Sequence, residues 1–167
     1  SARLNFCARG RRAIITCVNP VPLVLVPGLS CDAALWAPQV ETLQKVAQCW
    51  VADVARDDTM AAMARRVLDE SPFESFALAG LSMGGFVALA IVHEAAERVQ
   101  RLALLDTNAR PDSPERIRER LIFMSLAQRE GSLLTISNRM MARMIHPSRL
   151  ADMALVKSLQ DMAERIG

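Results

Sequence analysis

The sequence contains no tyrosine, and aromatic residues make up only 4% of its 167 residues. Surfaces that bind single-stranded nucleic acid stack bases on aromatic side chains, which are scarce in this chain. The formal net charge is only +2, and the arginines are spread along the chain without forming a basic stripe. No apolar run approaches the ~20 residues that span a bilayer. We therefore expect neither nucleic acid nor a membrane as a partner.

Histidine is also scarce, with only His93 and His146. The four cysteines are Cys7, Cys17, Cys31 and Cys49. No two of them form a C-x-x-C pair, and both histidines are far from them in the sequence. This spacing is not typical of a zinc site, and we expect no metal. Cysteines without regular spacing are typical of reduced, packed thiols, so the composition favours a cytoplasmic protein.

From residue 21 onward, short apolar segments alternate with segments of helical periodicity. The first of them, residues 21–26, is apolar on both faces, as in a parallel strand covered by helices on both sides. Such alternation indicates βαβ units and predicts an α/β fold with a mostly parallel sheet flanked by helices. The predicted strands are residues 21–26, 49–54, 76–80 and 99–105, and the predicted helices between them start near Pro38, at Asp58 or Thr59, and near Met83.

The pattern changes after Asp106, where only helices are predicted. The Ser-Pro pair at residues 113–114 provides an N-cap and a first-turn proline, which together open a helix. Breaks are expected near Gly131 and Pro147, and Ser148 is a candidate cap for the last helix. The C-terminal part of the chain is therefore predicted to be entirely helical.

Residues 1–20 are the least regular part of the chain. Their arginines precede an apolar run at residues 13–18, which is shorter than that of a signal peptide and lacks a convincing small-residue cleavage site. We interpret this run as an edge strand. The predicted organisation is thus an N-terminal segment, an α/β core over residues 21–110 and a helical cap, or lid, over residues 111–167.

One motif in the core carries chemical information. Residues 80–84 read Gly-Leu-Ser-Met-Gly, directly after a predicted strand and at the start of a predicted helix. In a G-x-S-x-G turn at such a place, the serine has a strained backbone and an exposed hydroxyl, and small residues let neighbouring segments approach closely. Ser82 is therefore the predicted nucleophile, with Gly80, Gly84 and Gly85 as its small neighbours. The alternative is an ordinary glycine-rich turn.

A serine that attacks an acyl group also needs two backbone N–H groups to bind the oxyanion of the tetrahedral intermediate. One is expected from Met83, the residue after the nucleophile. The other is expected from the loop after the first strand, where Gly28 lets the backbone turn and Leu29 is the candidate donor. The alternative for this loop is an ordinary turn that ends a strand.

These segments resemble the α/β-hydrolase fold family over about residues 21–167. The resemblance is carried by Leu-Val-Leu-Val-Pro-Gly at residues 23–28, by Trp36, by the serine motif with Gly85, and by Arg-Leu-Ala-Leu-Leu-Asp-Thr at residues 101–107. It implies a partial α/β-hydrolase fold in which the helical cap roofs the pocket and sets the choice of substrate.

The resemblance also implies a catalytic acid and a histidine that follow the nucleophile in the chain. The sequence ends at Gly167, in or just after a predicted cap helix, so we expect both residues to be missing from it. His93 is eleven residues beyond Ser82 on the same predicted helix, roughly 16 Å along its axis, which is too far for a base. His146 and Asp106 are less favoured candidates for base and acid, with helix-terminal and loop-capping roles as their alternatives.

The favoured function is a hydrolase that acts on a small ester, lactone or thioester through Ser82, with no cofactor. Acyl transfer, peracid formation and carbon–carbon cleavage at the same serine fit the resemblance equally. The alternative from another class is an inactive, truncated hydrolase-like protein that serves as a binding or structural module. The predicted cap contains the methionines Met140, Met141, Met144, Met153 and Met162. They either line an acyl site or fill the core of the cap.

Overall fold

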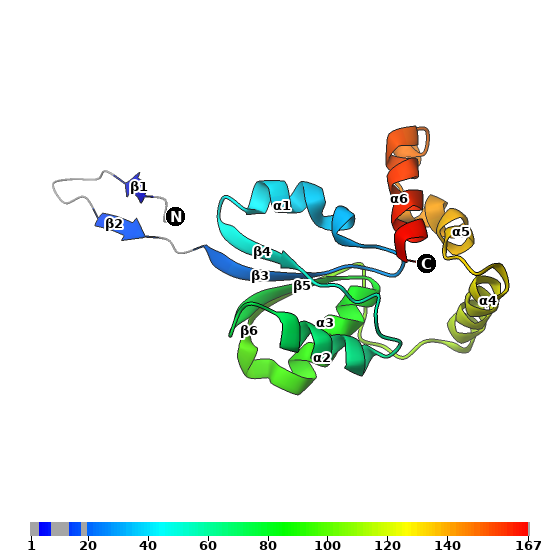
Figure 1. Cartoon of the computed structure of the whole chain (residues 1–167), viewed down its shortest axis with the longest axis horizontal. Coiled ribbons are helices and arrows are strands. Elements are labelled where there is room, and N and C mark those ends of the chain that lie inside the picture. Colours follow the sequence, from blue (N-terminus) through cyan, green and yellow to red (C-terminus); the bar gives the residue numbers. More distant parts are fainter. Residues whose placement is uncertain (1–3, 8–13, 18–19, 167) are drawn as a thin grey trace.

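Figure 1 shows the computed structural model, which describes residues 4–7, 14–17 and 20–166. Four parallel strands form the main sheet, in the order β4-β3-β5-β6. These strands are β3 (Val21–Val26), β4 (Ala47–Val51), β5 (Phe76–Leu81) and β6 (Val99–Leu105). The α/β fold class with a mostly parallel sheet, predicted from the alternating pattern, is confirmed.

Two further strands form a separate sheet. β1 (Leu4–Cys7) pairs in antiparallel fashion with β2 (Ile14–Cys17). The apolar run at residues 13–18 thus contains a strand, although residues 13 and 18 lie outside the described residues. In the described part of the chain, this strand pairs with β1 and not with an edge of the main sheet.

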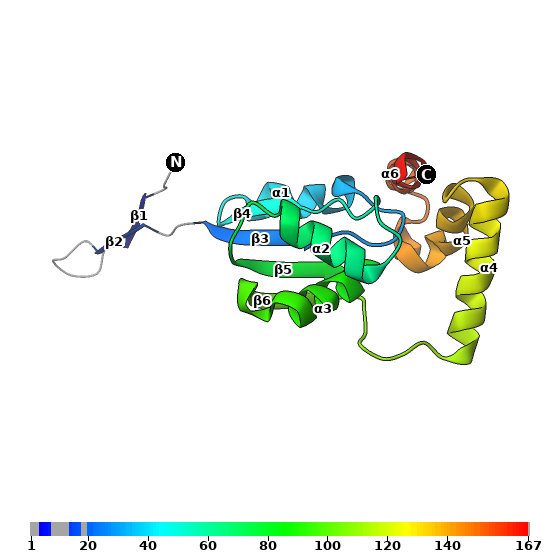
Figure 2. The same cartoon turned by 60° about the horizontal axis from the view of Figure 1, so that its bottom comes forward.

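Helices cover both faces of the main sheet. In chain order, the covering elements are η1 (Ala33–Trp36), α1 (Ala37–Leu43), α2 (Met60–Glu70), α3 (Met83–Ala95) and η2 (Ala96–Arg98). The short 3-10 helix η1 and α1 lie on one face, whereas α2 and α3 lie together on the other (Figures 1 and 2). The sheet is therefore buried on both sides over its central strands.

The side chains of β3 alternate between the two cores. Val24 and Val26 are fully buried against α2 and α3, while Leu25 packs against Trp36 on the opposite face. This arrangement explains why the segment at residues 21–26 is apolar at nearly every position. A strand covered on both faces has no solvent-facing side on which to place polar residues.

The second strand of the main sheet differs from its predicted bounds. The sequence predicts a strand at residues 49–54, but β4 ends at Val51. Ala52 and Val54 continue as irregular backbone and stay 3% and 4% exposed in the core beneath α2 and α3. The apolar pattern therefore extends past the strand because burial continues after the ladder ends.

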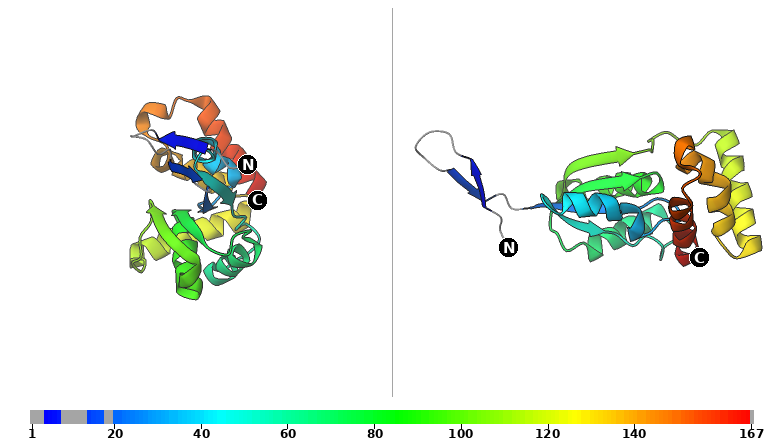
Figure 3. Two further views of the ribbon diagram at one scale, coloured as in Figure 1. Left: turned by 90° about the vertical axis from the view of Figure 1, so that its left-hand side faces the viewer. Right: turned by 90° about the horizontal axis from the view of Figure 1, so that it is seen from above.

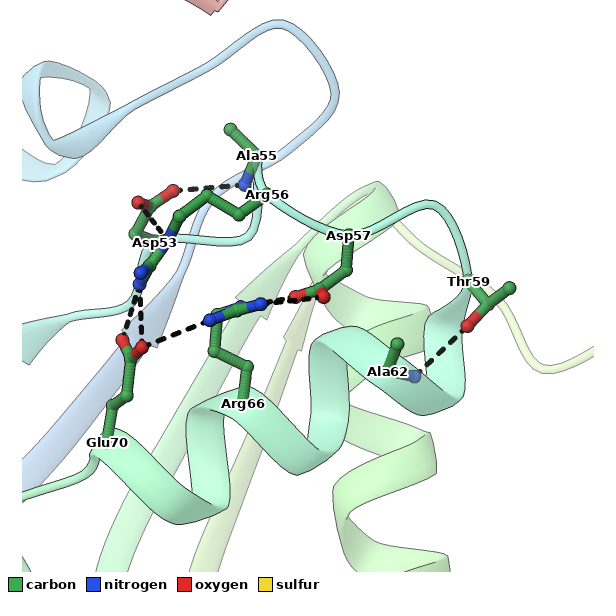
Figure 4. A network of polar contacts seen from close by, with 8 residues as sticks. All are labelled: Asp53, Ala55, Arg56, Asp57, Thr59, Ala62, Arg66 and Glu70. Atoms are coloured by element: carbon green, nitrogen blue, oxygen red, sulfur yellow. Dashed lines mark hydrogen bonds and ion pairs between the residues drawn. The ribbon is translucent and has the colours of Figure 1, made fainter.

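Ion pairs fasten the loop between β4 and α2 to that helix (Figure 4). Arg66 Nε donates to Asp57 Oδ2 at 2.5 Å, and Arg56 Nη2 donates to Glu70 Oε2 at 2.7 Å. At the start of α2, the Thr59 hydroxyl accepts from Ala62 N at 3.2 Å, as expected for a cap. The loop is thus held against α2 by two ion pairs and joined to its start by the cap.

β6 forms an open edge of the main sheet. Among the described residues, its only strand neighbour is β5. Leu102 and Leu104 are each 41% exposed, and Leu105 is 38% exposed. This outer edge of the sheet therefore exposes apolar side chains.

Three helices follow β6 and lie beyond the carboxyl ends of the parallel strands (Figures 2 and 3). They are α4 (Pro114–Glu130), α5 (Leu134–Met144) and α6 (Met153–Ile166), with a short η3 (Pro147–Arg149) before α6. Ser113 Oγ caps α4 by accepting from Arg116 N at 3.3 Å, and Gly131 ends it with a φ of 62°, both at predicted places. Within the described residues, no helix is long and apolar enough to cross a membrane.

The cap of α6 was predicted at the wrong residue. Asp152 caps this helix, since its Oδ1 accepts from Leu155 N at 3.0 Å. Ser148 lies earlier, inside η3, where its hydroxyl is 2.8 Å from His146 Nδ1. The 3-10 turn η3 separates Ser148 from α6, so the helix begins later in the chain than the sequence pattern predicts.

Candidate active site

Ser82 forms the turn between β5 and α3. Its φ of 52° and ψ of −113° are rarely adopted by non-glycine residues, and such a conformation costs about 1–3 kcal/mol. Hydrogen bonds hold both sides of the turn, because Ser82 N donates to Leu105 O and Gly85 N donates to Ser82 O, each at 2.9 Å. The residue is exposed. The strained, solvent-facing serine turn therefore stands where the sequence places it.

The glycines of the motif leave no room for a side chain. A Cβ on Gly80 would lie 2.2 Å from Gly84 O, and one on Gly84 would lie 2.3 Å from Val26 O. A Cβ on Gly85 would lie 2.4 Å from Thr107 Cγ2. The first turn of α3 thus packs directly on β5, on the end of β3 and on the segment after β6. These contacts fix the position of the serine relative to three strands.

The loop after β3 runs alongside the serine turn. A Cβ on Gly28 would lie 3.6 Å from Ser82 Cβ and 3.4 Å from Leu81 O. Cys31 N donates to Gly28 O at 3.2 Å and closes a turn, in which Ser30 has a φ of 59°. The structure therefore brings together the two segments that the sequence analysis singled out, although they are more than fifty residues apart.

Two backbone amides near this junction are free to bind a ligand. Met83 is the first residue of α3, and the first N–H groups of a helix have no partner within the helix. Leu29 is on the adjacent turn, and its N–H has no hydrogen-bond acceptor among the residues that the structure describes. A helix N-terminus also carries partial positive charge. Together these features suit negative charge that develops on an oxygen beside Ser82.

Asp106 follows the edge strand of the sheet. The register aligns Leu81 with Leu105, so Asp106 is level with Ser82 along the neighbouring strand. Its φ of 45° is again unusual for a non-glycine residue, and its side chain is exposed. Within the described residues, no hydrogen bond links this carboxylate to the serine or to a histidine.

Neither histidine lies in hydrogen-bond contact with the serine. His93 is exposed near the carboxyl end of α3, the end remote from Ser82. His146 is exposed at the start of η3, where its ring contacts Ser148. In the described part of the chain, the Ser82 hydroxyl has no hydrogen bond to any base.

Cys31 is the other potential nucleophile close to the serine turn, and its surroundings make it unreactive. The side chain is 6% exposed. Burial, together with the neighbouring Asp32 carboxylate, raises the pKa of the Cys31 thiol to about 11. The reactive thiolate is therefore nearly absent at neutral pH. This leaves Ser82 as the nucleophile candidate at this edge of the sheet.

The loop is also joined to the last helix, a contact that the sequence analysis missed. Arg165 Nε donates to Asp32 Oδ2 at 2.6 Å, and this bond holds the pKa of the Asp32 carboxyl below its usual value. The two residues are separated by 133 positions. Neither residue belongs to a recognisable motif, so only the folded chain reveals the pair.

The cap methionines divide between packing and exposure. Met162 is 2% exposed and packs with Cys31 and Ile145, and Met141 packs partly buried against the same cluster. Met153 is 71% exposed and Met144 is 39% exposed. Core packing thus accounts for the buried pair, whereas the side chains of the other two face solvent.

The parallel sheet, the serine turn and the glycine contacts around it define the class of this protein. The sequence model described as alpha/beta hydrolase fold matches residues 21–133. The chain therefore belongs to the α/β-hydrolase family.

Individual relatives agree with this assignment. The chain is 32% identical over 120 residues to the "Putative carbamate hydrolase RutD" of Azorhizobium caulinodans, with 62% of this chain and 45% of that protein covered. The structure is similar to a malate-bound thermophilic esterase from Thermogutta terrifontis, with a TM-score of 0.72, 29% identity, and coverage of 86% of this chain and 58% of that one. It also shares its fold with the enol-lactonase from Burkholderia xenovorans, with a TM-score of 0.74, 24% identity, and coverage of 89% and 62%. The chain thus spans about half the length of the curated relative and about three fifths of the solved structures.

Proposed function

We propose that this chain carries the nucleophile and the oxyanion-binding part of a serine hydrolase that acts on a small ester, lactone or thioester. The observation that carries the proposal is the exposed, positive-φ Ser82 at a strand–helix turn, packed beside the Gly28 turn. A strained serine with a free hydroxyl is the arrangement that nucleophilic attack on a carbonyl requires. The esterase and the carbamate hydrolase among its relatives are named for substrates of related chemistry, a carbonyl bearing a heteroatom leaving group.

In the proposed reaction, Ser82 Oγ attacks the carbonyl carbon and its proton passes to a general base. The carbonyl oxygen becomes an oxyanion, which the N–H groups of Met83 and Leu29 bind. Each such donor contributes roughly 10²–10³-fold to the rate in well-studied serine enzymes. The carbon–heteroatom bond then breaks, and the leaving group takes a proton from the protonated base. Water attacks the acyl-serine by the same route and releases the acid.

The general base is the part of this reaction that the described residues do not supply. Among the described residues, neither His93, in the last turn of α3, nor His146, whose ring contacts Ser148, makes a hydrogen bond to the Ser82 hydroxyl, and Asp106 makes none to either histidine. We therefore propose that a histidine outside these 167 residues takes the proton. Serine without such a base is a poor nucleophile, so the chain by itself is expected to react slowly or not at all.

The helical segment at residues 114–166 is proposed to roof the site. It lies beyond the carboxyl ends of the strands, where ligands bind in open α/β sheets (Figure 3). Its packing against Cys31 brings α6 to the loop that carries Leu29. A roof at this place would exclude water and shape the acyl pocket.

A fluorophosphonate probe, which forms a covalent bond with activated serines, tests the proposal. We expect little labelling of the 167-residue chain, strong labelling of a longer chain from the same gene, and loss of that labelling in Ser82→Ala. Ser125→Ala, which removes an exposed serine on α4, is the matched control and should label normally. Labelling that survives in Ser82→Ala would overturn the assignment of the nucleophile. A longer chain that also fails to label would favour the inactive binding module.

A further inference from the structure

The loop that carries Leu29 is held from two sides. On one side, Gly28 lies against Ser82, with 3.6 Å between a Cβ built on Gly28 and Ser82 Cβ. On the other side, Cys31 and Asp32 contact α6, the last helix of the chain. Only one closed turn separates the two attachments, since Cys31 N donates to Gly28 O. The exposed Leu29 lies on this turn.

Asp32 connects the turn to α6 through one carboxylate oxygen and to η1 through the other. Oδ2 accepts from Arg165 Nε at 2.6 Å, and Oδ1 accepts from Ala34 N at 2.9 Å, which caps η1. The carboxylate therefore fixes the direction in which the chain leaves the turn. An ion pair that is half exposed, as Arg165 is at 51%, contributes little to global stability. Its main effect is on local geometry.

Cys31 provides the apolar half of the same attachment. Its side chain packs in one cluster with Leu159 and Met162 of α6 and with Ile145. All four are buried, between 2% and 8% exposed. A displacement of α6 would therefore also displace Cys31, which is two positions after Leu29.

We propose that Asp32 and Arg165 are positioning residues that lock the Leu29 amide in its oxyanion-binding place by tying it to α6. The inference rests on the proposed function, because it concerns the alignment of the same oxyanion site. It makes the closed position of the helical segment a condition for catalysis. The site would be aligned when α6 is seated on the loop and misaligned when α6 lifts.

The reactivity of the Cys31 thiol tests this attachment without any enzymatic activity. In a Cys7→Ser, Cys17→Ser, Cys49→Ser background, Cys31 is the only thiol, and it reacts with a chromogenic disulfide reagent only when α6 lifts. We expect Asp32→Asn and Arg165→Gln to raise the labelling rate severalfold, and Arg165→Lys to restore most of the protection. Lys157→Gln is the matched control, because it removes the Lys157–Asp161 pair on the same helix without touching the loop.

Ester hydrolysis by a longer chain supplies the second readout. Asp32→Asn should lower kcat by about tenfold or more and leave KM nearly unchanged, because the oxyanion exists only in the transition state and the intermediate. A Cys31 labelling rate that is the same in Asp32→Asn, Arg165→Gln and the parent would overturn the inference. So would hydrolysis that depends on Ser82 but is unaffected by Asp32→Asn, and that result would leave the proposed function intact. Faster Cys31 labelling in the variants of a protein whose longer form never hydrolyses esters would support the contact between the loop and α6. It would contradict the proposed hydrolase function.

Discussion

Gly84, at the start of α3, lies directly against Val26, at the end of β3. A Cβ placed on Gly84 would be 2.3 Å from the Val26 carbonyl oxygen and 2.5 Å from that of Pro27. The obstacle is backbone that belongs to the central strand, so no side-chain rotation relieves it. The nucleophile turn can therefore reach the loop after β3 only because this residue has no side chain.

Gly84→Ala is expected to destabilise the protein strongly. In an ordinary helix, replacing glycine by alanine stabilises by about 1 kcal/mol, so the contact with Val26 reverses the sign of the effect. We expect a loss of at least ~3 kcal/mol in the free energy of unfolding, measured by urea titration. Gly131→Ala is the control, since a Cβ there meets nothing within 4 Å and only the φ of 62° opposes it. It should lose only ~1 kcal/mol, and equal losses at both glycines would contradict this account.

The strain at Ser82 predicts an unusual order of stability among its variants. Alanine keeps the strain of the positive φ, whereas glycine relieves it, so Ser82→Gly should be more stable than Ser82→Ala by ~1 kcal/mol. At Ser125, an exposed position of α4, the order should be reversed, because glycine is the poorer helix former. Thermal unfolding of the four variants measures both differences. The same order at both sites would mean that Ser82 is unstrained.

Local features of the site could be predicted from the sequence. The strand before Ser82 and the helix after it depend on neighbours within a few residues, and the glycines could be recognised because they belong to the short serine motif. The edge strand at residues 99–105 has the predicted bounds for the same reason. Features that depend on distant contacts could not be predicted in this way.

Two cases show why the remainder escaped prediction. The strand at β4 ends before its apolar run does, because Ala52 and Val54 stay buried in the core beneath α2 and α3 after the regular strand has ended. The contact between Asp32 and Arg165 joins a loop to the last turn of the chain, and charged residues of both signs occur throughout the sequence. Hydrophobic periodicity says which face of a segment is buried, but it does not say which partner buries it.

Arg98 is expected to be important for stability although it lies away from the site. Its guanidinium donates to the carbonyl oxygens of Leu68, Phe73 and Glu74 at 2.7–2.9 Å and lies over the Phe76 ring. Arg98→Ala leaves these carbonyls without their donors and should lower the free energy of unfolding by ~2–4 kcal/mol.

A second arginine serves as the comparison for Arg98. Arg65 makes a single exposed pair with Glu94 at 3.2 Å, so Arg65→Ala should lose less than ~1 kcal/mol. Urea unfolding at neutral pH measures both variants. A loss at Arg98 no larger than that at Arg65 would show that the three carbonyl contacts contribute little.

The loop before α2 predicts a dependence of stability on pH. The hydrogen bond from Arg66 lowers the pKa of the Asp57 carboxyl below its usual value near 3.8 (Figure 4). A carboxyl whose pKa is lower in the folded state stabilises that state fully above the unfolded pKa, and this contribution is lost as the pH falls through the folded pKa. Asp57→Asn should therefore be less stable than the parent at pH 7, and the difference should shrink below about pH 4.

Urea unfolding at a series of pH values measures this difference. Asp58→Asn is the control, because within the described residues Asp58 makes no ion pair, although it is the adjacent residue and undergoes the same change. The stability of this control relative to the parent should vary much less with pH. A difference between Asp57→Asn and the parent that stays constant from pH 7 to the acid limit would rule out the pair as its source.

The open edge at β6 predicts concentration-dependent self-association of this chain. The outer side of β6 presents unpaired backbone groups, and Leu102 and Leu104 expose apolar surface on one face of the strand. Natural sheets protect such edges with charged side chains, since an unprotected edge pairs with another strand. Leu104→Lys should therefore keep the protein monomeric at concentrations where the parent associates, as measured by sedimentation velocity. Val46→Lys removes a more exposed apolar side chain, 61% exposed against 41% for Leu104, away from this edge and should associate like the parent. Both variants reduce the exposed hydrophobic area. Only a difference in association between them therefore assigns the association to β6 and not to nonspecific hydrophobic contacts.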